Sequence, residues 1–408
     1  MENSLQNIRE LLGKNEAKKA ESLISRLLRD DLPDIQRAEL LVQRSHSHLL
    51  NNNPGHGLED LEIVRDIAPH LFQSPSTQSL LADCYHARSN RSDIEQAQQI
   101  YQNIIREFSQ YSNLGWVHYQ YGQILLNDDH VEQAKSQFQI ALNKLSGIKA
   151  LRSYCYERLG FIEFQNQRDC KLSLKLLKLA TTTYPPEDSP IWLVSVHLLR
   201  SQVMLACGQL ESAITAASAA VKIASLENDG NTLTEALLSA SELLGQIDSC
   251  EERTISYLQL FLKNSPRPAG ISITWSRAHE LLGDAYFKQG VYKLAAEAYT
   301  SALEFNPDHP WETSISYQIA KCHYQQGDFK NTIATIKRLL DASDKDGTPM
   351  NDYRVYDMLG NALFALTQYE AAADAYQMAL SLASPSVEGL DKIKLYHHFS
   401  RQLLESNS

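Results

Sequence analysis

Residues 276–309 carry a hydrophobic pattern that predicts two amphipathic helices joined by a tight turn. In the first helix, Leu282 and Tyr286 lie about one helical turn apart, so their side chains fall on the same face. Gly290 suits the left-handed conformation that ends many helices, and Pro307 ends the second helix because proline cannot continue one. The second helix carries its small and apolar residues at Tyr292, Ala295, Ala296, Tyr299, Ala302 and Leu303.

The glycine inside the first helix has a packing role in this interpretation. Gly283 lacks a Cβ, so we expect the second helix to approach it closely. A helix pair of this size cannot bury its apolar face alone. The pattern therefore predicts neighbouring pairs that stack along the chain.

The same spacing recurs along most of the sequence. After residue 74 we count eight units, at residues 76–108, 115–149, 153–186, 194–224, 232–266, 276–309, 313–346 and 353–385. The unit at 232–266 keeps the pattern only in its second helix, and residues 341–352 have the composition of an exposed loop. The N-terminal region predicts two weaker units, with helices near 3–13, 15–30, 34–51 and 57–70.

This pattern resembles the tetratricopeptide repeat, most clearly at Gly283, Tyr286, Gly290, Tyr299 and Pro307. The resemblance implies an all-α fold, a right-handed α-solenoid (superhelix) of antiparallel helix pairs. We expect four regions along the chain. They are degenerate N-terminal helical repeats at 1–74, repeats with irregular spacing at 75–267, regular repeats at 268–386, and a C-terminal capping helix and tail at 387–408.

The resemblance also implies where a partner binds. In tetratricopeptide-repeat proteins the first helices line an extended concave surface, and side chains there that do not pack on the second helix meet the ligand. Carried onto this chain, the expected partner-binding residues are Trp116, Tyr119, Gln123, Asn127, Tyr154, Glu157, Phe161, Glu280, Asp284, Lys288, Lys321, Gln325, Arg354 and Asn361. Gln165, Phe287 and Asp357 occupy further positions of this kind.

Two readings of the aromatic members of this set stay open. Trp116, Tyr119, Tyr154 and Phe161 could anchor a partner, because exposed aromatic side chains are effective interface residues. They could equally pack between adjacent repeats, as Phe164 is expected to do at its usual core position.

The resemblance also bears on the chemistry of the partner. Some members of the family hold the C-terminal carboxylate of a peptide with Lys, Asn and Arg on successive first helices. Here Glu280 and Asp284 occupy the leading positions, and two carboxylates one turn apart repel a third. We therefore expect a protein or peptide partner that is basic or neutral, and not a ligand held by a C-terminal carboxylate clamp.

Charge and motifs disfavour several other functions. The formal net charge of −11 disfavours direct nucleic-acid binding, which requires a basic surface. No phosphate-loop, G-x-S-x-G or H-E-x-x-H signature is present, so we expect neither enzyme activity nor a cofactor. His46 and His48 fall on different faces of a helix with no cysteine or carboxylate nearby to complete a ligand set, so no metal site is expected.

The cysteines and the apolar segments indicate the cellular compartment of the protein. The six cysteines form no C-x-x-C pair, which is typical of reduced thiols in a cytosolic protein. Cys84 and Cys322 each follow a small helix-packing residue by two positions and are expected to be buried. No secretory signal is apparent, and no run approaches the ~18 apolar residues of a membrane span. We therefore expect a cytoplasmic protein without membrane insertion.

These observations favour a non-catalytic scaffold or adaptor that binds a peptide or protein partner in the concave groove. The alternative is a regulatory protein in which a peptide or small effector changes the pitch of the superhelix and so controls an output protein. Because repeat proteins also self-associate through their ends, a homodimer remains open.

Overall fold

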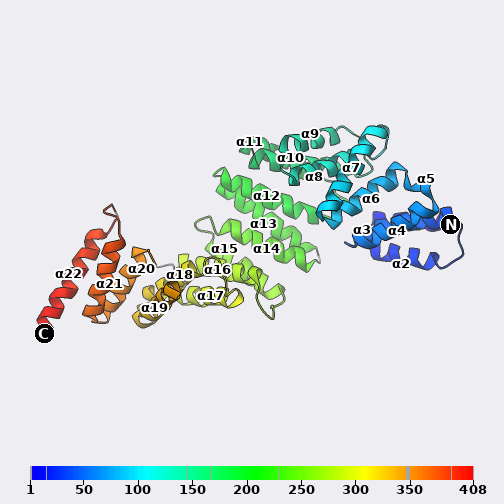
Figure 1. Cartoon of the computed structure of the whole chain (residues 1–408). Helices are drawn as coiled ribbons and strands as arrows, with labels where there is room; N and C mark the ends of the chain where they lie inside the picture. Colours follow the sequence, from blue (N-terminus) through cyan, green and yellow to red (C-terminus); the bar gives the residue numbers. More distant parts are fainter. Residues whose placement is uncertain are drawn as a thin grey trace. The chain divides into compact units, whose positions relative to one another are not determined.

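The computed structural model of the protein describes residues 2–14, 16–144, 146–166, 168–227, 229–345, 350–386 and 388–407. Within these ranges the regular structure is helical and no β-strand occurs, which confirms the all-α solenoid class. The chain divides into two compact units, an N-terminal unit at Met1–Ser189 and a C-terminal unit at Pro190–Ser408. Figure 1 colours both units along the sequence.

The helices follow one another with short connections. The N-terminal unit contains α1 (Glu2–Gly13), α2 (Ala17–Leu27), α3 (Asp34–Leu50), α4 (Pro54–Ile67), α5 (Pro69–Phe72), α6 (Pro75–Arg88), α7 (Arg91–Glu107), α8 (Leu114–Asn127), α9 (Val131–Ala141), α10 (Leu151–Gln165) and α11 (Cys170–Thr183). The C-terminal unit contains α12 (Ile191–Ala206), α13 (Leu210–Leu226), α14 (Gly230–Leu244), α15 (Glu251–Asn264), α16 (Ile273–Lys288), α17 (Tyr292–Phe305), α18 (Glu312–Gln325), α19 (Phe329–Lys345), α20 (Tyr353–Ala365), α21 (Tyr369–Leu382) and α22 (Leu390–Asn407).

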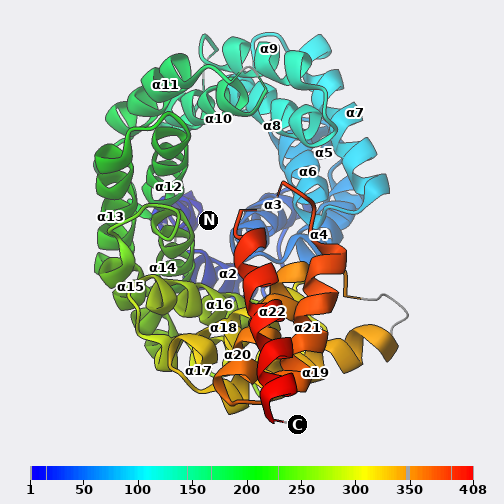
Figure 2. The same cartoon turned by 90° about the vertical axis from the view of Figure 1, so that its left-hand side faces the viewer.

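Consecutive helices pack as pairs, and the pairs stack on their neighbours within each unit. The pairs are α3 with α4, α6 with α7, α8 with α9 and α10 with α11 in the N-terminal unit, then α12 with α13 and onward to α20 with α21. In Figure 2, α6, α8 and α10 lie on the inner side of the N-terminal unit and α7, α9 and α11 lie on its outer side. The first helix of each of these pairs therefore lines the inner side.

A small residue of the first helix and a large residue of the second meet at the centre of several pairs. A Cβ built on Gly283 would lie only 2.6 Å from the ring of Tyr299, so the predicted close approach is confirmed. The other pairs of this kind are Gly122 with Phe138, Gly160 with Leu177 and Gly360 with Tyr376. In each of them the large side chain is buried, so glycine sets how closely the two helices pack.

Where the large residue is a tyrosine, its hydroxyl bonds the residue that follows the small one. The three hydrogen bonds run from Tyr101 to Asp83 (2.5 Å), from Tyr299 to Asp284 (2.6 Å) and from Tyr376 to Asn361 (3.0 Å). The same contact thus fixes both the helix separation and the rotation of the first helix about its axis.

The turns inside several pairs need a left-handed residue. Gly290 has a φ of 77° between α16 and α17, as its position in the sequence predicts, and Gly327 has a φ of 73° after α18. Glycine adopts this conformation without the steric cost that a Cβ brings. These turns bring the two helices of each pair back against each other.

The unit predicted at 232–266 is confirmed as a helix pair, in which α14 buries small and aliphatic residues (Ala236 and Leu237, for example) in place of the usual aromatic pattern. One sequence prediction needs correction. The loop expected over 341–352 begins later, since α19 continues to Lys345. Residues 346–349 of that stretch lie outside the described residues.

The state of the cysteines and the apolar character of the helices test two expectations about the cellular compartment. Four cysteines are free and buried, namely Cys84, Cys155, Cys250 and Cys322, so burial of Cys84 and Cys322 is confirmed. Cys170 and Cys207 are disulfide-bonded, so the expectation of six reduced thiols is wrong for these two. Over the described ranges, none of the helices has both the length and the apolar character that a membrane crossing requires.

We predict that Gly283→Ala destabilises the C-terminal unit. The added methyl group would overlap the ring of Tyr299, and overpacking of this kind costs about 1–3 kcal/mol, partly offset by about 1 kcal/mol of improved helix propensity. Urea unfolding should therefore show a lower midpoint. Gly230→Ala is the control, because a Cβ added to that helical glycine would have nothing within 4 Å. An equal response of the two variants would contradict this account of the packing.

Candidate functional site

First helices of the N-terminal unit enclose a hollow of about 470 Å³, which we call the N-terminal hollow. Helices α3 and α6 supply much of its wall, and the first turns of α8 and α10 with the loops that precede them supply the rest. The lining residues are Val42, Gln43, His46, Leu49, Leu50, Ser76, Ser79, Leu80, Asp83, Tyr111, Asn113, Trp116, Ile148 and Tyr154. Of the residues expected at the concave surface, Trp116 and Tyr154 lie here.

Helical spacing explains why these side chains converge. On α3, Val42, His46 and Leu49 are separated by four and three positions, so they share one face. On α6, Ser76 and Asp83 stand two turns apart on the face that lines the hollow. Two neighbouring first helices therefore present successive turns to one cavity.

Asp83 is the charged residue at the wall of this hollow, and it is bonded by three neutral groups. The phenol of Tyr101 donates to Oδ1 at 2.5 Å, and the amide of Gln120 donates to the same oxygen at 3.5 Å. The indole Nε1 of Trp116 donates to Oδ2 at 3.0 Å. These donors hold the half-buried carboxyl group in one orientation.

The electrostatic setting of Asp83 is unusual because no positive charge balances it. Burial raises the pKa of Asp83 to about 6, against the opposing effect of its three hydrogen bonds. Among the described residues no lysine or arginine forms an ion pair with it: Arg44 is paired with Asp60 and Arg88 with Asp93. His46 also lines the hollow, and burial lowers the pKa of its imidazole.

Aromatic rings form the wall beside Asp83. Trp116 stacks on Tyr119 with ring centroids 5.4 Å apart, and Tyr119 in turn contacts Phe138 (5.6 Å) and Tyr154 (6.0 Å). Tyr119 is only 7% exposed, so it supports the wall from behind. Trp116 and Tyr154 are half-buried and line the hollow itself.

A second, smaller hollow of about 280 Å³ lies between α18, α20 and α22, and we call it the C-terminal hollow. It brings together five of the positions expected at the concave surface, namely Lys321, Gln325, Arg354, Asp357 and Asn361. Its remaining wall includes three tyrosines, Tyr317, Tyr324 and Tyr353, and the side chain of Lys392. This hollow is more polar in its residue types than the N-terminal hollow.

Most of the polar groups in the C-terminal hollow are already engaged. Arg354 forms an ion pair with Asp352 at 2.6 Å, and Lys321 lies 4.7 Å from the ring centroid of Phe287. The amide of Asn361 donates to Asp357 at 3.2 Å. Lys321, Arg354 and Asn361 therefore each have a partner within the protein.

The three predicted residues on α16 lie in neither of these hollows. Glu280 forms an ion pair with Arg277 at 2.8 Å, and Asp284 accepts the hydrogen bond from Tyr299. Lys288 donates to the carbonyl of Gly245 at 2.8 Å. Asp284 and Lys288 border only a cavity of about 30 Å³, which is too small for a peptide side chain.

The other predicted residues take several positions on α8 and α10. Gln123 is half-buried and donates to the hydroxyl of Tyr119 at 3.3 Å. Asn127 and Gln165 are exposed, whereas Phe161 is half-buried. Glu157 is 7% exposed and lies 2.9 Å from Arg158, so it does not face solvent.

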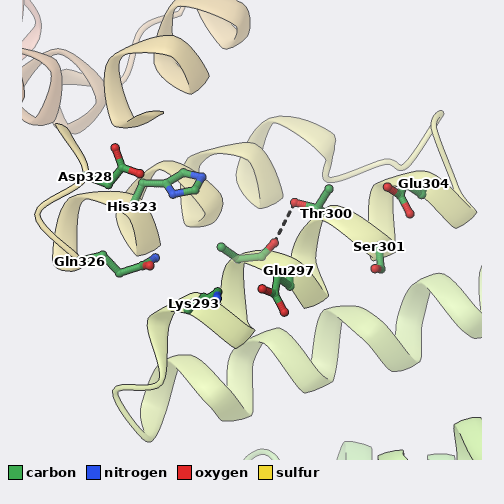
Figure 3. Close-up of a pocket in the computed structure, with 9 residues that line it drawn as sticks. Lys293, Glu297, Thr300, Ser301, Glu304, His323, Gln326 and Asp328 are labelled. Carbon is green, nitrogen blue, oxygen red and sulfur yellow. Dashed lines mark hydrogen bonds between the residues drawn. The ribbon is translucent and has the colours of Figure 1, made fainter. Parts of the chain in front are cut away.

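A third hollow, of about 500 Å³, lies on α17 and the end of α18 (Figure 3). Lys293, Glu297, Thr300 and Glu304 follow α17, and His323 faces them from α18. Thr300 bonds the carbonyl of Ala296 in its own helix at 2.8 Å. No group of three or more His, Cys, Asp or Glu in the described part of the chain could hold a metal ion. The wall is formed mainly by a second helix, so this hollow lies off the expected concave surface.

Comparison with known sequences identifies the repeat. Two family models described as tetratricopeptide repeat match residues 276–310 and 353–385. Both segments contain the glycine–tyrosine contact described above. No curated protein sequence matches the chain.

Two solved structures are similar to this chain in fold. The apo form of the quorum sensor NprR from B. thuringiensis has a TM-score of 0.55 and 14% identity, covering 74% of this chain and 86% of its own. The apo form of RapI has a TM-score of 0.50 and 14% identity, covering 90% of this chain and 98% of its own. The fold is that of an α-helical repeat protein. The chain contains tetratricopeptide repeats at residues 276–310 and 353–385.

The sequence did not identify Asp83 or the contribution of α3. A signal for Asp83 was present, because it follows the small residue Ala82 as Asp284 follows Gly283. Aligning Ala82 with Gly283 places Asp83 on the inner side of α6. No comparable signal marks Val42, His46 or Leu50, since the N-terminal region lacks the glycine and aromatic positions that set the register.

We predict that the stability of the protein responds to pH through Asp83. Because its pKa is raised, the Asp83 carboxyl binds a proton more tightly in the folded state than in the unfolded state, where its pKa is 3.8. The stabilisation is complete below the unfolded pKa and is lost as pH rises through about 6. The wild type should thus lose stability relative to Asp83→Asn between about pH 4 and about pH 6, as urea unfolding would show. A pH-independent difference between the two proteins would contradict the assignment.

Proposed function

We propose that the protein is a non-catalytic interaction scaffold that binds a peptide segment of a partner protein in the N-terminal hollow. The observation that carries the proposal is the convergence of four first helices on one accessible cavity. A volume of about 470 Å³ falls in the range of ligand sites, which run from about 300 to 1,000 Å³.

The walls of the hollow suit a peptide side chain. Leu50 is 44% exposed although it is apolar, and Leu49 and Val42 stand beside it on the same helix. Covering apolar area of this kind contributes roughly 25 cal/mol per Å². An apolar or partly apolar side chain of a partner would therefore be stabilised here.

The rim of the hollow suits the backbone of a peptide. Gln43 and Ser76 place an amide and a hydroxyl group beside the apolar wall, whereas Ser79 is buried and Asn113 already bonds Ser146. Such groups can donate to and accept from peptide N–H and C=O groups, which must find partners when they leave water. The combination of an apolar wall and a polar rim favours an extended peptide over a purely apolar ligand.

The same residues support a non-catalytic role and argue against a terminal carboxylate as the ligand. The lining residues of the N-terminal hollow include no cysteine, and within this described lining His46 forms no hydrogen bond to Ser76 or Ser79. Nucleophilic catalysis relies on such a pairing. The absence of a lysine or arginine from this lining and the presence of Asp83 disfavour an anionic ligand.

Several finer expectations stay predictions. They are the regulatory alternative, in which a ligand changes the superhelix pitch, the homodimer, and the lack of direct nucleic-acid binding. The cytoplasmic location also stays a prediction, because four free buried thiols suit a reducing compartment whereas disulfide-bonded Cys170 and Cys207 are typical of an oxidising one.

We predict that Leu50→Gln weakens peptide binding. A random library of blocked octapeptides is selected on the wild type, and affinities of the retained peptides are measured by calorimetry. Loss of apolar contact at Leu50 should weaken them by about 3–10-fold. Ile35→Gln is the control, because Ile35 is 53% exposed on the same helix but does not line the hollow. Equal losses in both variants, or no retained peptide on the wild type, would contradict the proposal.

A further inference from the structure

We propose that the N-terminal hollow recognises a basic side chain of the bound peptide, a lysine or an arginine whose cationic group bonds Asp83. This inference rests on the proposed function and names the chemistry that selects the partner. It starts from one observation: the hollow holds a carboxylate that this chain itself leaves without a countercharge among its described residues.

The carboxylate is oriented but not neutralised. Its three donors are a phenol, an indole and an amide, all of them uncharged. A half-buried carboxylate without a cation is costly, because low-polarity surroundings disfavour the ionised form. A cation brought by a ligand would offset this cost, whereas a neutral ligand would bury the charge further.

The geometry leaves room for one more donor. A carboxylate offers about four lone-pair positions, and Oδ1 of Asp83 already accepts from Tyr101 and Gln120. Oδ2 accepts only from Trp116 among the described residues. Asp83 also lines the hollow, so a donor that enters it can reach the open position on Oδ2.

The surroundings suit the rest of a basic side chain. Leu80 and Leu49 line the approach to Asp83, and an aliphatic stem of lysine or arginine can pack on such residues while its charged end bonds the carboxylate. Trp116 adds an aromatic surface, to which cations are attracted. The net charge of −11 would also speed the approach of a basic segment.

The equivalent aspartate in the repeat formed by α16 and α17 does have cations near it. Asp284 occupies the same position after the small residue and accepts the same tyrosine bond, but the charges of Arg277 and Lys288 act on it. Asp284 is also exposed and lies outside the N-terminal hollow. Asp284→Asn therefore matches Asp83→Asn in net charge and in local chemistry.

The test uses the full-length protein and the library of blocked octapeptides, whose ends carry no charge. We expect the wild type to retain peptides with lysine or arginine at one defined position. Replacing that residue by norleucine should weaken binding at least tenfold. Asp83→Asn should weaken binding of the basic peptide by a similar factor and leave binding of the norleucine peptide unchanged. Asp284→Asn should bind both peptides with the affinity of the wild type.

The outcomes separate the two proposals. Retained peptides without a basic residue, or equal binding of the lysine and norleucine peptides, would overturn the assignment of Asp83 and leave the peptide-binding function standing. Failure to retain any peptide would overturn both. If Asp83→Asn does not fold, as circular dichroism would show, the comparison of lysine with norleucine on the wild type still decides the matter. Binding that needs an unblocked N-terminus would identify a terminal amine as the ligand and overturn the side-chain assignment.

Discussion

The close contact between a small residue of one helix and a large residue of the next is the constraint on which the structure depends. At Gly283 the space for a Cβ is occupied by the ring of Tyr299, and Gly360 meets Tyr376 in the same way. The contact fixes the distance between the two helices of a pair. It also buries the large side chain, so repeated pairs can stack into a continuous core.

The same contact determines which side chains reach the inner side of each unit. Because the tyrosine hydroxyl bonds the residue after the small one, that residue is held in a fixed orientation on the first helix. In the C-terminal unit the position carries Asp284 and Asn361, whose surroundings supply other polar or charged partners. In the N-terminal unit it carries Asp83, which faces an apolar hollow whose lining includes no lysine or arginine. One structural rule thus produces different chemistry in different repeats.

The sequence predicted the fold better than the site, for a physical reason. Glycine, tyrosine and proline at fixed spacing report backbone constraints that act locally, so the pair at 276–309 could be read directly. A binding hollow depends on side chains from several helices, and their convergence has no local signature. The position of Asp83 after Ala82 marks its place on the repeat, but the sequence does not show that α3 packs opposite it and closes a cavity there. The disulfide-bonded state of Cys170 likewise had no sequence signal.

The central claim is that the N-terminal hollow is where a partner binds. Amide hydrogen exchange of the full-length protein, with and without a peptide retained from the library, tests this most directly. A ligand that binds only the folded state slows local opening where it binds. The account predicts slower exchange concentrated in α3, α6 and the start of α8. Protection confined to α18 and α20, or to α17, would contradict it.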